Sequence, residues 1–267
     1  MTREELYLQM KAKGSMLCVG LDTDYAKIPE CVKAGRSVGE AVLEFNRRII
    51  DATASHCVAY KPNLAFYEAL GIKGLSVLDK TVDYLRTNHP EQFLIADAKR
   101  GDIGNTAKMY ARSLFSTFDF DAVTISPYMG SETVTPFLEY PGRYAIVVAL
   151  SSNSSSADFQ TALKDGKPLY RVVMERMMEI STPESMMFVV GATKADKLKE
   201  IRQFCPDNFF LVPGVGAQGG SAEEVMSNGA NDKGGLLINS SRGVLYASAG
   251  EDFAQAAALS AAATARF

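Results

Sequence analysis

The chain has 267 residues, of which 47% are hydrophobic and 22% are charged, so its length fits one α/β barrel or two small domains with a sizeable core. The formal net charge of −3 gives no overall attraction to nucleic acid or anionic lipid, and an anionic ligand would therefore need a local site. No apolar stretch is long enough to span a bilayer and residues 1–5 lack the apolar region of a signal peptide, so we expect a cytoplasmic protein without membrane or nucleic-acid partners.

Short apolar runs alternate with longer amphipathic segments along the chain. The runs predict strands at residues 16–21, 57–61, 93–98, 122–126, 144–150, 186–190, 209–212 and 235–239. The segments between them predict helices at residues 38–54, 74–88, 106–118, 168–181 and 222–228, and an Ala-rich helix at 252–265. Most of the strand runs show no polar alternation, which is typical of parallel strands that are covered on both faces.

Eight strands that alternate with helices predict βαβ units and a parallel sheet. Eight is also the number that closes a (β/α)8 TIM barrel, and the chain length is typical of that fold. A doubly wound open sheet is the structural alternative. Because no linker, composition shift or repeat divides the chain, we expect a single α/β domain over residues 1–267.

The most informative segment is FLIADAKRGDIGNT, residues 93–106. Side chains alternate along a strand, so Asp97 and Lys99 should point to the same side, which can be the catalytic mouth at the carboxyl end of a barrel strand. Asp102 follows where the next helix should begin. The same residues also admit a structural interpretation, in which Asp97 and Lys99 form an ion pair and Asp102 caps the helix.

Two neighbouring strands favour a site over that interpretation. Lys61 ends the second predicted strand in the sequence YKPN, and Asp22 ends the first in VGLD. Three consecutive strands would therefore bring Asp22, Lys61 and the pair Asp97 and Lys99 to one rim. Each ammonium group would be flanked by carboxylates, which keeps the set ionised.

A second region of interest follows the seventh and eighth predicted strands. The turn VPGVGAQGG, residues 212–220, is rich in glycine, and Arg242 follows the last strand. Glycine lets backbone N–H groups approach an anion, and a guanidinium group binds phosphate through two hydrogen bonds. These loops are the usual phosphate site of a (β/α)8 barrel, whereas the spacing does not fit a P-loop and the late position does not fit a Rossmann fingerprint.

The cysteine and histidine content gives little support to a metal site. The four cysteines are widely separated and include no C-x-x-C pair, and the only histidines are His56 and His89. Both histidines are expected to be structural, and Cys18 and Cys57 lie in apolar runs where burial is expected. We therefore predict reduced thiols, no bound metal and no histidine-based mechanism.

Residues 93–106 resemble the signature segment of the orotidine 5′-phosphate decarboxylases, and the matching positions are Asp97, Lys99, Asp102, Ile103 and Thr106. The YKPN and VGLD sequences, the PGVGAQGG turn and Arg242 match in the order of the family as well. The segments ISPYMG and ALSSN, residues 125–130 and 149–153, resemble the longer bacterial branch of that family.

The resemblance implies a lyase that removes CO2 from C6 of orotidine 5′-monophosphate and gives UMP, the last step of de novo pyrimidine nucleotide synthesis, without metal or organic cofactor. Lys99 would stabilise and then protonate the carbanion-like C6, and Asp97 would lie beside the departing carboxylate. Lys61 and Asp22 would hold ribose hydroxyls. Asp102 and Thr106 would reach across a homodimer interface, which makes the active site composite.

The resemblance also implies contacts to the rest of the nucleotide. Ser151, or the adjacent Ser152, would contact the pyrimidine edge. Gln218 and Arg242 would bind the phosphate with help from backbone amides near Gly216 or Ser241. Pro213 belongs to the same substrate-binding turn, which we expect to close together with the serine-rich stretch after Ser151.

Two other functions remain open at this point. Metal-dependent sugar-phosphate decarboxylases and aldolase-like synthases of the same superfamily resemble the D-x-K-x-x-D strand, although the further acidic ligand and histidine-type groups that they generally need cannot be placed here. A barrel that binds a nucleotide without catalysis is the second alternative, and the intact set of Lys61, Asp97, Lys99 and Asp102 argues against it.

Overall fold

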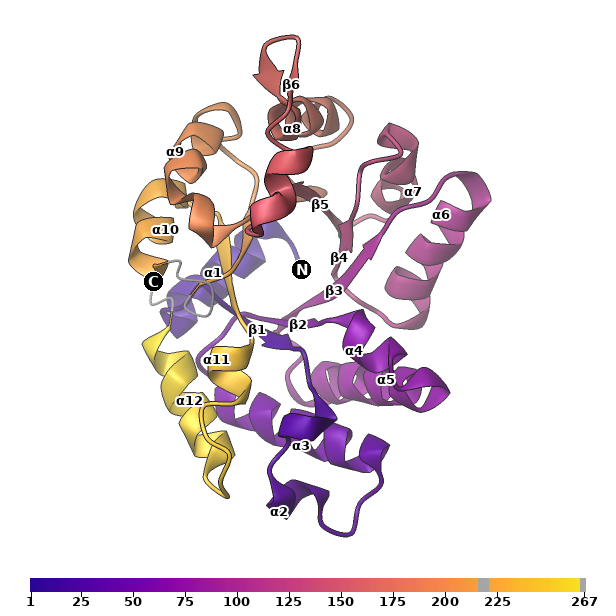
Figure 1. Ribbon diagram of the computed structural model, residues 1–267, viewed down its shortest axis with the longest axis vertical. Helices are drawn as coiled ribbons and strands as arrows, with labels where there is room; N and C mark the ends of the chain where they lie inside the picture. Colours follow the sequence, from indigo (N-terminus) through magenta and orange to yellow (C-terminus); the bar gives the residue numbers. More distant parts are fainter. Residues whose placement is uncertain (216–220, 265–267) are drawn as a thin grey trace.

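The computed structural model describes residues 1–215 and 221–264 and shows a closed barrel of eight parallel strands with helices around it (Figure 1). Around the barrel the strands follow the order β1, β10, β9, β8, β5, β4, β3, β2. Their bounds are β1 Leu17–Leu21, β2 Ala59–Pro62, β3 Phe93–Arg100, β4 Ala122–Ile125, β5 Tyr144–Leu150, β8 Met186–Val190, β9 Phe210–Pro213 and β10 Leu236–Ser240. The predicted (β/α)8 barrel is confirmed, and the open sheet is wrong because β1 pairs with both β2 and β10.

The helices follow the strands along the chain and cover the outside of the barrel (Figure 1). The six predicted helices correspond to α3 Val38–Thr53, α5 Gly71–Asn88, α6 Gly104–Arg112, α8 Leu169–Glu179, α10 Ala222–Gly229 and α12 Phe253–Ala263. The structure adds α1 Arg3–Lys13 and α9 Ala195–Phe204, the short helices α2 Glu30–Lys33, α4 Leu64–Glu68, α7 Thr135–Leu138 and α11 Arg242–Leu245, and the hairpin β6 Leu163–Lys164 and β7 Lys167–Pro168. The helix predicted over 106–118 ends early, because a π-helical turn replaces it at Ser113–Thr117.

The barrel strands are buried on both faces. Every residue of β1, β2, β4 and β8 is buried, including Lys61, and the same is true of the first five residues of β3. One face packs on the barrel interior and the other on the surrounding helices, which explains why the strand sequences lack polar alternation. Among the parts of the chain that the structure describes, no helix combines the length and apolarity needed to cross a bilayer.

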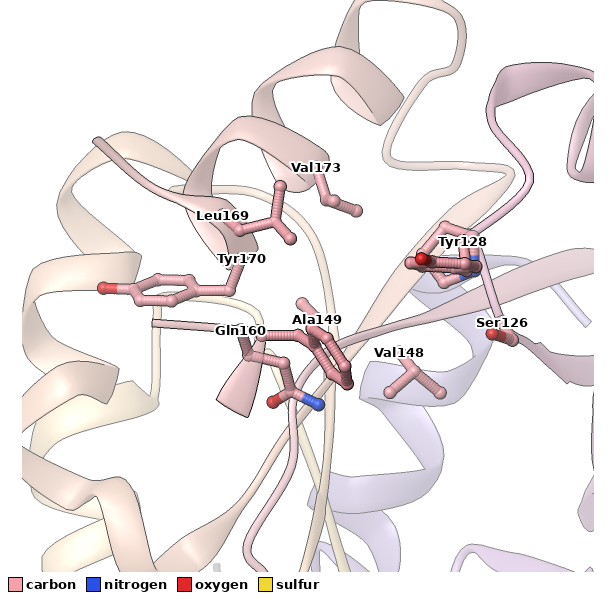
Figure 2. Close-up of a pocket in the computed structure, with 10 residues that line it drawn as sticks. Ser126, Tyr128, Val148, Ala149, Gln160, Leu169, Tyr170 and Val173 are labelled. Carbon is pink, nitrogen blue, oxygen red and sulfur yellow. The ribbon is translucent and has the colours of Figure 1, made fainter. Parts of the chain in front are cut away.

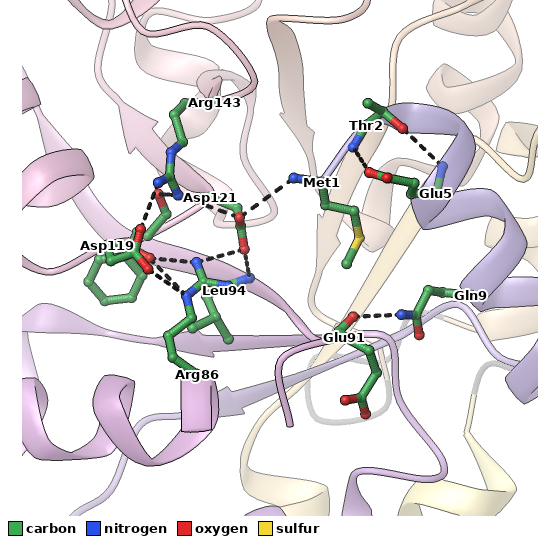
Figure 3. A network of polar contacts seen from close by, with 11 residues as sticks. Met1, Thr2, Glu5, Gln9, Arg86, Glu91, Leu94, Asp119, Asp121 and Arg143 are labelled. Atoms are coloured by element: carbon green, nitrogen blue, oxygen red, sulfur yellow. Dashed lines mark hydrogen bonds and ion pairs between the residues drawn. The ribbon is translucent and has the colours of Figure 1, made fainter. Parts of the chain in front are cut away.

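The amino end of the barrel is closed by α1 and by an ion-pair network centred on Asp121, just before β4 (Figure 3). The buried Asp121 carboxylate accepts the Leu94 N–H at 2.8 Å and lies 3.0 Å from the guanidinium of Arg86 and 3.5 Å from that of Arg143. Asp119, which is half exposed, pairs with the same two arginines. This network connects β3, β4 and α5 at the end of the barrel opposite the predicted site.

Candidate active site

Four charged side chains meet at the carboxyl ends of three neighbouring strands. Asp22 directly follows β1, Lys61 lies on β2, and Asp97 and Lys99 lie on β3. Lys61 Nζ is 2.9 Å from Asp97 Oδ2 and 3.8 Å from Asp22 Oδ1. Lys99 Nζ is 2.5 Å from Asp97 Oδ1, so each carboxylate oxygen of Asp97 accepts from a different lysine.

Burial separates the two lysines of this cluster. The side chain of Lys61 is 4% exposed and that of Asp97 is 10% exposed, whereas the side chain of Lys99 is 56% exposed. Burial alone would lower the pKa of Lys61, but the charges of Asp97 and Asp22 outweigh it and raise that pKa. Burial alone would raise the pKa of Asp97, but Lys61 and Lys99 hold it well below its usual range. Lys61 and Asp97 are therefore both charged at neutral pH, and the exposed amino group of Lys99 is open to a ligand.

Lys99 reaches Asp97 through an irregularity of β3 rather than through simple strand alternation. The pairs Ala96–Val123 and Arg100–Ile125 are in register, so β3 advances four residues while β4 advances two. Lys99 within this bulge has φ 45°, a left-handed conformation that is uncommon outside glycine. Bulges next to active sites redirect side chains, and this one places Lys99 over Asp97. Thr124, which lies opposite the bulge, is not evident as a site residue from the sequence, because one threonine in an apolar strand forms no pattern.

Asp22 keeps a free acceptor while its backbone is firmly held. Tyr246 Oη donates to the carbonyl oxygen of Asp22 at 3.2 Å and accepts the Asp24 N–H at 2.8 Å. Tyr67 Oη donates to the carbonyl oxygen of Leu21 at 3.1 Å. Apart from its long ion pair with Lys61, the buried Asp22 Oδ1 has no hydrogen-bond partner among the described residues. A ligand hydroxyl group could donate to this oxygen.

Asp102 and Thr106 do not join the cluster of their own chain. Asp102 Oδ1 accepts the Ile103 N–H at 2.8 Å, and Thr106 is exposed on α6. In the described residues, neither side chain has a hydrogen bond or ion pair with Lys61, Asp97 or Lys99. The interpretation of Asp102 as the cap of this helix is wrong, because α6 begins at Gly104 and its cap position is held by Ile103 without a side-chain bond.

The two candidate base-contacting serines differ in their surroundings after β5. Ser151 donates its N–H to Gln160 Oε1 at 2.8 Å, and Gln160 Nε2 donates to Ser151 Oγ at 2.9 Å. Ser152 instead packs on Gly191, where an added Cβ would lie 2.6 Å from the Ser152 nitrogen. Gln160 therefore orients Ser151, whereas the backbone of Ser152 is covered by the end of β8.

A cavity of about 420 Å³ lies beside the Ser151 loop, between β5 and α8 (Figure 2). Val148 of β5 and Leu169 and Val173 of α8 contribute apolar side chains (Figure 2). Gln160 also lines the cavity and is hydrogen-bonded to Ser151. None of the four clustered charged residues lines this cavity. The candidate site is thus identified by the arrangement of its charged side chains and not by the volume of a cavity.

The predicted phosphate residues lie on or after β9 and β10, and β10 is the neighbour of β1 in the barrel. Pro213 ends β9 and is partly exposed, and Arg242 begins α11 with an exposed side chain that has no hydrogen bond or ion pair within residues 1–215 and 221–264. Ser241 approaches β1 so closely that a Cβ on Gly20 would lie 1.9 Å from Ser241 Oγ, which only glycine permits. Gly216 and Gln218 lie outside the described residues. In those residues, no group of three or more His, Cys, Asp or Glu side chains is arranged to hold a metal ion.

Comparison with known proteins places this chain in one family. The family model described as orotidine 5′-phosphate decarboxylase / HUMPS matches residues 15–257. An orotidine 5′-phosphate decarboxylase of Parabacteroides distasonis is 54% identical over 258 residues, 96% of this chain and 91% of the relative. One of Porphyromonas gingivalis is 50% identical over 267 residues, 100% of this chain and 96% of the relative.

Solved structures agree with the relatives in sequence. An orotidine monophosphate decarboxylase of Leishmania donovani is 35% identical and superimposes with a TM-score of 0.81, covering 96% of this chain and 95% of that chain. A model match over most of the chain, together with relatives of this identity and coverage, shows that the chain belongs to the orotidine 5′-phosphate decarboxylase / HUMPS family.

Proposed function

We propose that this chain, acting as one catalytic domain over residues 1–267, decarboxylates orotidine 5′-monophosphate to UMP without metal or organic cofactor. The observation that carries the proposal is the ionised array of Lys61, Asp97 and Lys99, buried at one side and open at Lys99. The names of the relatives that share half of its sequence point to the same reaction.

The reaction needs a cation and a proton at one place. When the bond between C6 and the carboxylate breaks, CO2 leaves and its bonding electron pair remains on C6. The ammonium of Lys99 stabilises this pair as a preorganised cation and transfers a proton from Nζ to C6, which forms the new C–H bond. Lys99 is left neutral and regains a proton from solvent, which its exposed side chain permits. Asp97 holds Lys99 in place and lies beside the departing carboxylate.

Lys61 and Asp22 bind the ribose in this proposal. Asp22 Oδ1, which has no hydrogen-bond partner in the described residues, is a buried acceptor that a ribose hydroxyl would satisfy. Lys61 lies between Asp22 and Asp97 and supplies a donor to the same hydroxyls while it balances both carboxylates.

The remaining contacts hold the two ends of the nucleotide. Ser151, oriented by Gln160, contacts the pyrimidine edge and is preferred over Ser152. The guanidinium of Arg242, which has no partner among the described residues, binds the phosphate, and Pro213, Gly216, Gln218 and Ser241 complete that part of the site. Binding energy from this remote phosphate serves positioning at C6.

Asp102 and Thr106 act in the neighbouring subunit of a homodimer. Among the described residues, neither side chain has a hydrogen bond or ion pair with the charged cluster of its own chain. Ile103, between them, is 47% exposed, and Met109 on α6 is 56% exposed, so this segment presents apolar surface that a second copy would cover. The active site is then composite, and the isolated subunit is inactive.

A metal-dependent reaction on the same strand fits this geometry poorly. A divalent cation bound to Asp97 would face ammonium groups that already lie 2.9 Å and 2.5 Å from its two oxygens. The repulsion and the loss of both ion pairs would oppose binding.

The experiment follows the loss of absorbance as orotidine 5′-monophosphate becomes UMP, with the purified protein in excess chelator and in added divalent metal. We expect equal rates under the two conditions. Turnover that disappears in chelator, or binding of the nucleotide without turnover, would overturn the proposal in favour of a metal-dependent enzyme or a nucleotide-binding protein.

A further inference from the structure

The bulge of β3 leaves a gap in the hydrogen-bond ladder beside the reacting lysine. β3 and β4 are neighbours in the barrel (Figure 1). Between the paired positions Ala96–Val123 and Arg100–Ile125, β3 contains two residues more than β4. The backbone N–H of Lys99 consequently has no regular partner on β4, and an unpaired buried N–H group is costly. Lys99 also has φ 45°, so the local backbone is held in a sparsely populated conformation by its surroundings.

Thr124 of β4 fills this gap with its side chain. Its hydroxyl accepts the Lys99 N–H at 2.9 Å and donates to Asp97 Oδ1 at 3.0 Å. The residue is 1% exposed, and the same Asp97 oxygen accepts from Lys99 Nζ at 2.5 Å. One hydroxyl thus connects the backbone of the lysine to the carboxylate that holds the ammonium group of that lysine.

We propose that Thr124 is a positioning residue, whose hydroxyl holds the backbone of Lys99 and the carboxylate of Asp97 in the arrangement that delivers the lysine ammonium to the reacting carbon. The inference rests on the proposed roles of Lys99 and Asp97. Thr124 acts through these two residues and does not itself handle the proton.

The chemistry of the position explains the residue type. The group must accept from an N–H and donate to a carboxylate at once, which a hydroxyl does and a hydrocarbon side chain of the same shape does not. Valine at 124 would leave the Lys99 N–H without its partner and remove one donor from Asp97. Small displacements of a catalytic group lower the rate steeply, so the effect should appear in turnover.

The test compares Thr124→Val and Thr124→Ser with Thr53→Val in the full-length protein. Thr53 on α3 is a matched control, because it is 0% exposed and its hydroxyl also makes two hydrogen bonds, to Ile49 O and to Tyr60 Oη. We expect Thr124→Val to lower kcat by about 10- to 100-fold while KM for orotidine 5′-monophosphate changes little. Thr124→Ser should recover most of the loss, and Thr53→Val should lower the melting temperature without lowering kcat of the folded protein.

The pH profile supplies a second measurement. A carboxylate that loses a hydrogen-bond donor is protonated more readily, so the acid limb of kcat should move to higher pH in Thr124→Val and not in Thr53→Val. If Thr124→Val fails to fold, Thr124→Ala against Thr124→Ser carries the same comparison, since these two differ only in the hydroxyl.

The outcomes separate this inference from the proposed function. Equal kcat for Thr124→Val and Thr53→Val, or equally low kcat for Thr124→Val and Thr124→Ser, overturns the inference even if Lys99→Ala is inactive. A parent protein that does not convert the nucleotide, or a Lys99→Ala variant that converts it normally, overturns the proposed function and this inference with it.

Discussion

Two buried aspartates, one at each end of the barrel, are each held by two cationic side chains. Asp97 at the carboxyl end is 9% exposed and pairs with Lys61 and Lys99. Asp121 at the amino end is 5% exposed and pairs with Arg86 and Arg143 (Figure 3). The two carboxylates are buried to a similar degree and lie at similar distances from their cationic partners, yet the two sites suit different functions.

The two sites differ in the type of cation and in whether a cationic group remains accessible. Arg86 and Arg143 also bind Asp119 and backbone carbonyls, and a guanidinium does not give up a proton in a protein. The ammonium of Lys99 is half exposed and belongs to a residue type that can donate a proton. A carboxylate whose arginine partners are engaged in further contacts stabilises the fold, whereas a carboxylate with one accessible lysine leaves a proton donor open to a ligand.

The largest effect should follow loss of the accessible lysine. We expect Lys99→Ala to lower kcat for orotidine 5′-monophosphate by about 10²- to 10⁴-fold, because the proton donor and the cation are lost together. Circular dichroism and size-exclusion chromatography should show a folded protein of unchanged assembly. Near-normal turnover in this variant would refute the assigned role of Lys99.

The amino-end aspartate should affect stability instead of turnover. We expect Asp121→Asn to lower the free energy of unfolding in urea by about 2 kcal/mol or more, because two partly buried guanidinium groups lose their buried charged partner. Asp119→Asn removes a carboxylate from the same arginines at a half-exposed position and should cost under about 1 kcal/mol. The rate per folded molecule should stay unchanged in both, and a drop in that rate for Asp121→Asn would remove the distinction between the two ends.

Arg242 provides a third test. Among the described residues its guanidinium has no partner at the carboxyl end of the barrel, whereas Arg86 is paired at the amino end. We expect Arg242→Ala to lower kcat/KM by about 10- to 100-fold through loss of a charged phosphate contact, with little change in the melting temperature. With a substrate that lacks the phosphate group, added phosphite should not raise the turnover of Arg242→Ala, because the group that would bind the phosphite is missing. A full kcat with raised KM would mean that the phosphate contact contributes only uniform binding.

The smallest effect concerns acid stability. The pKa of Asp97 is lowered by folding, so its ion pairs stabilise the protein above the unfolded value of about 3.9, and this contribution is lost as the pH falls from there towards the folded pKa. We expect the difference in unfolding free energy between the parent and Asp97→Asn to shrink below about pH 4. A difference that grows with acidification would contradict the depressed pKa.

The strands and the charged rim could be predicted from the sequence because both are local properties. An apolar run such as Ala145–Val148 identifies a buried strand by composition alone, and the eight predicted strands agree with the observed ones within two residues at each end. Asp22, Lys61, Asp97 and Lys99 end or follow such runs, and parallel strands necessarily present these ends at one rim. The helices α1 and α9 were missed, since both have a polar composition, and α1 also has little apolar periodicity.

What only the tertiary structure decided depends on contacts between segments far apart in the chain. Strand alternation predicted the right neighbours for Asp97. The backbone that carries Lys99 to Asp97, however, forms a bulge whose shape depends on the register of β4 and on the hydroxyl of Thr124. The start of α6 at Gly104, and with it the separation of Asp102 from its own cluster, was likewise not evident from spacing. The sequence by itself determined which charges stand at the mouth, because burial and strand polarity are encoded locally. Folding decided how Lys99 is aimed, because a register and a backbone conformation exist only when two strands meet.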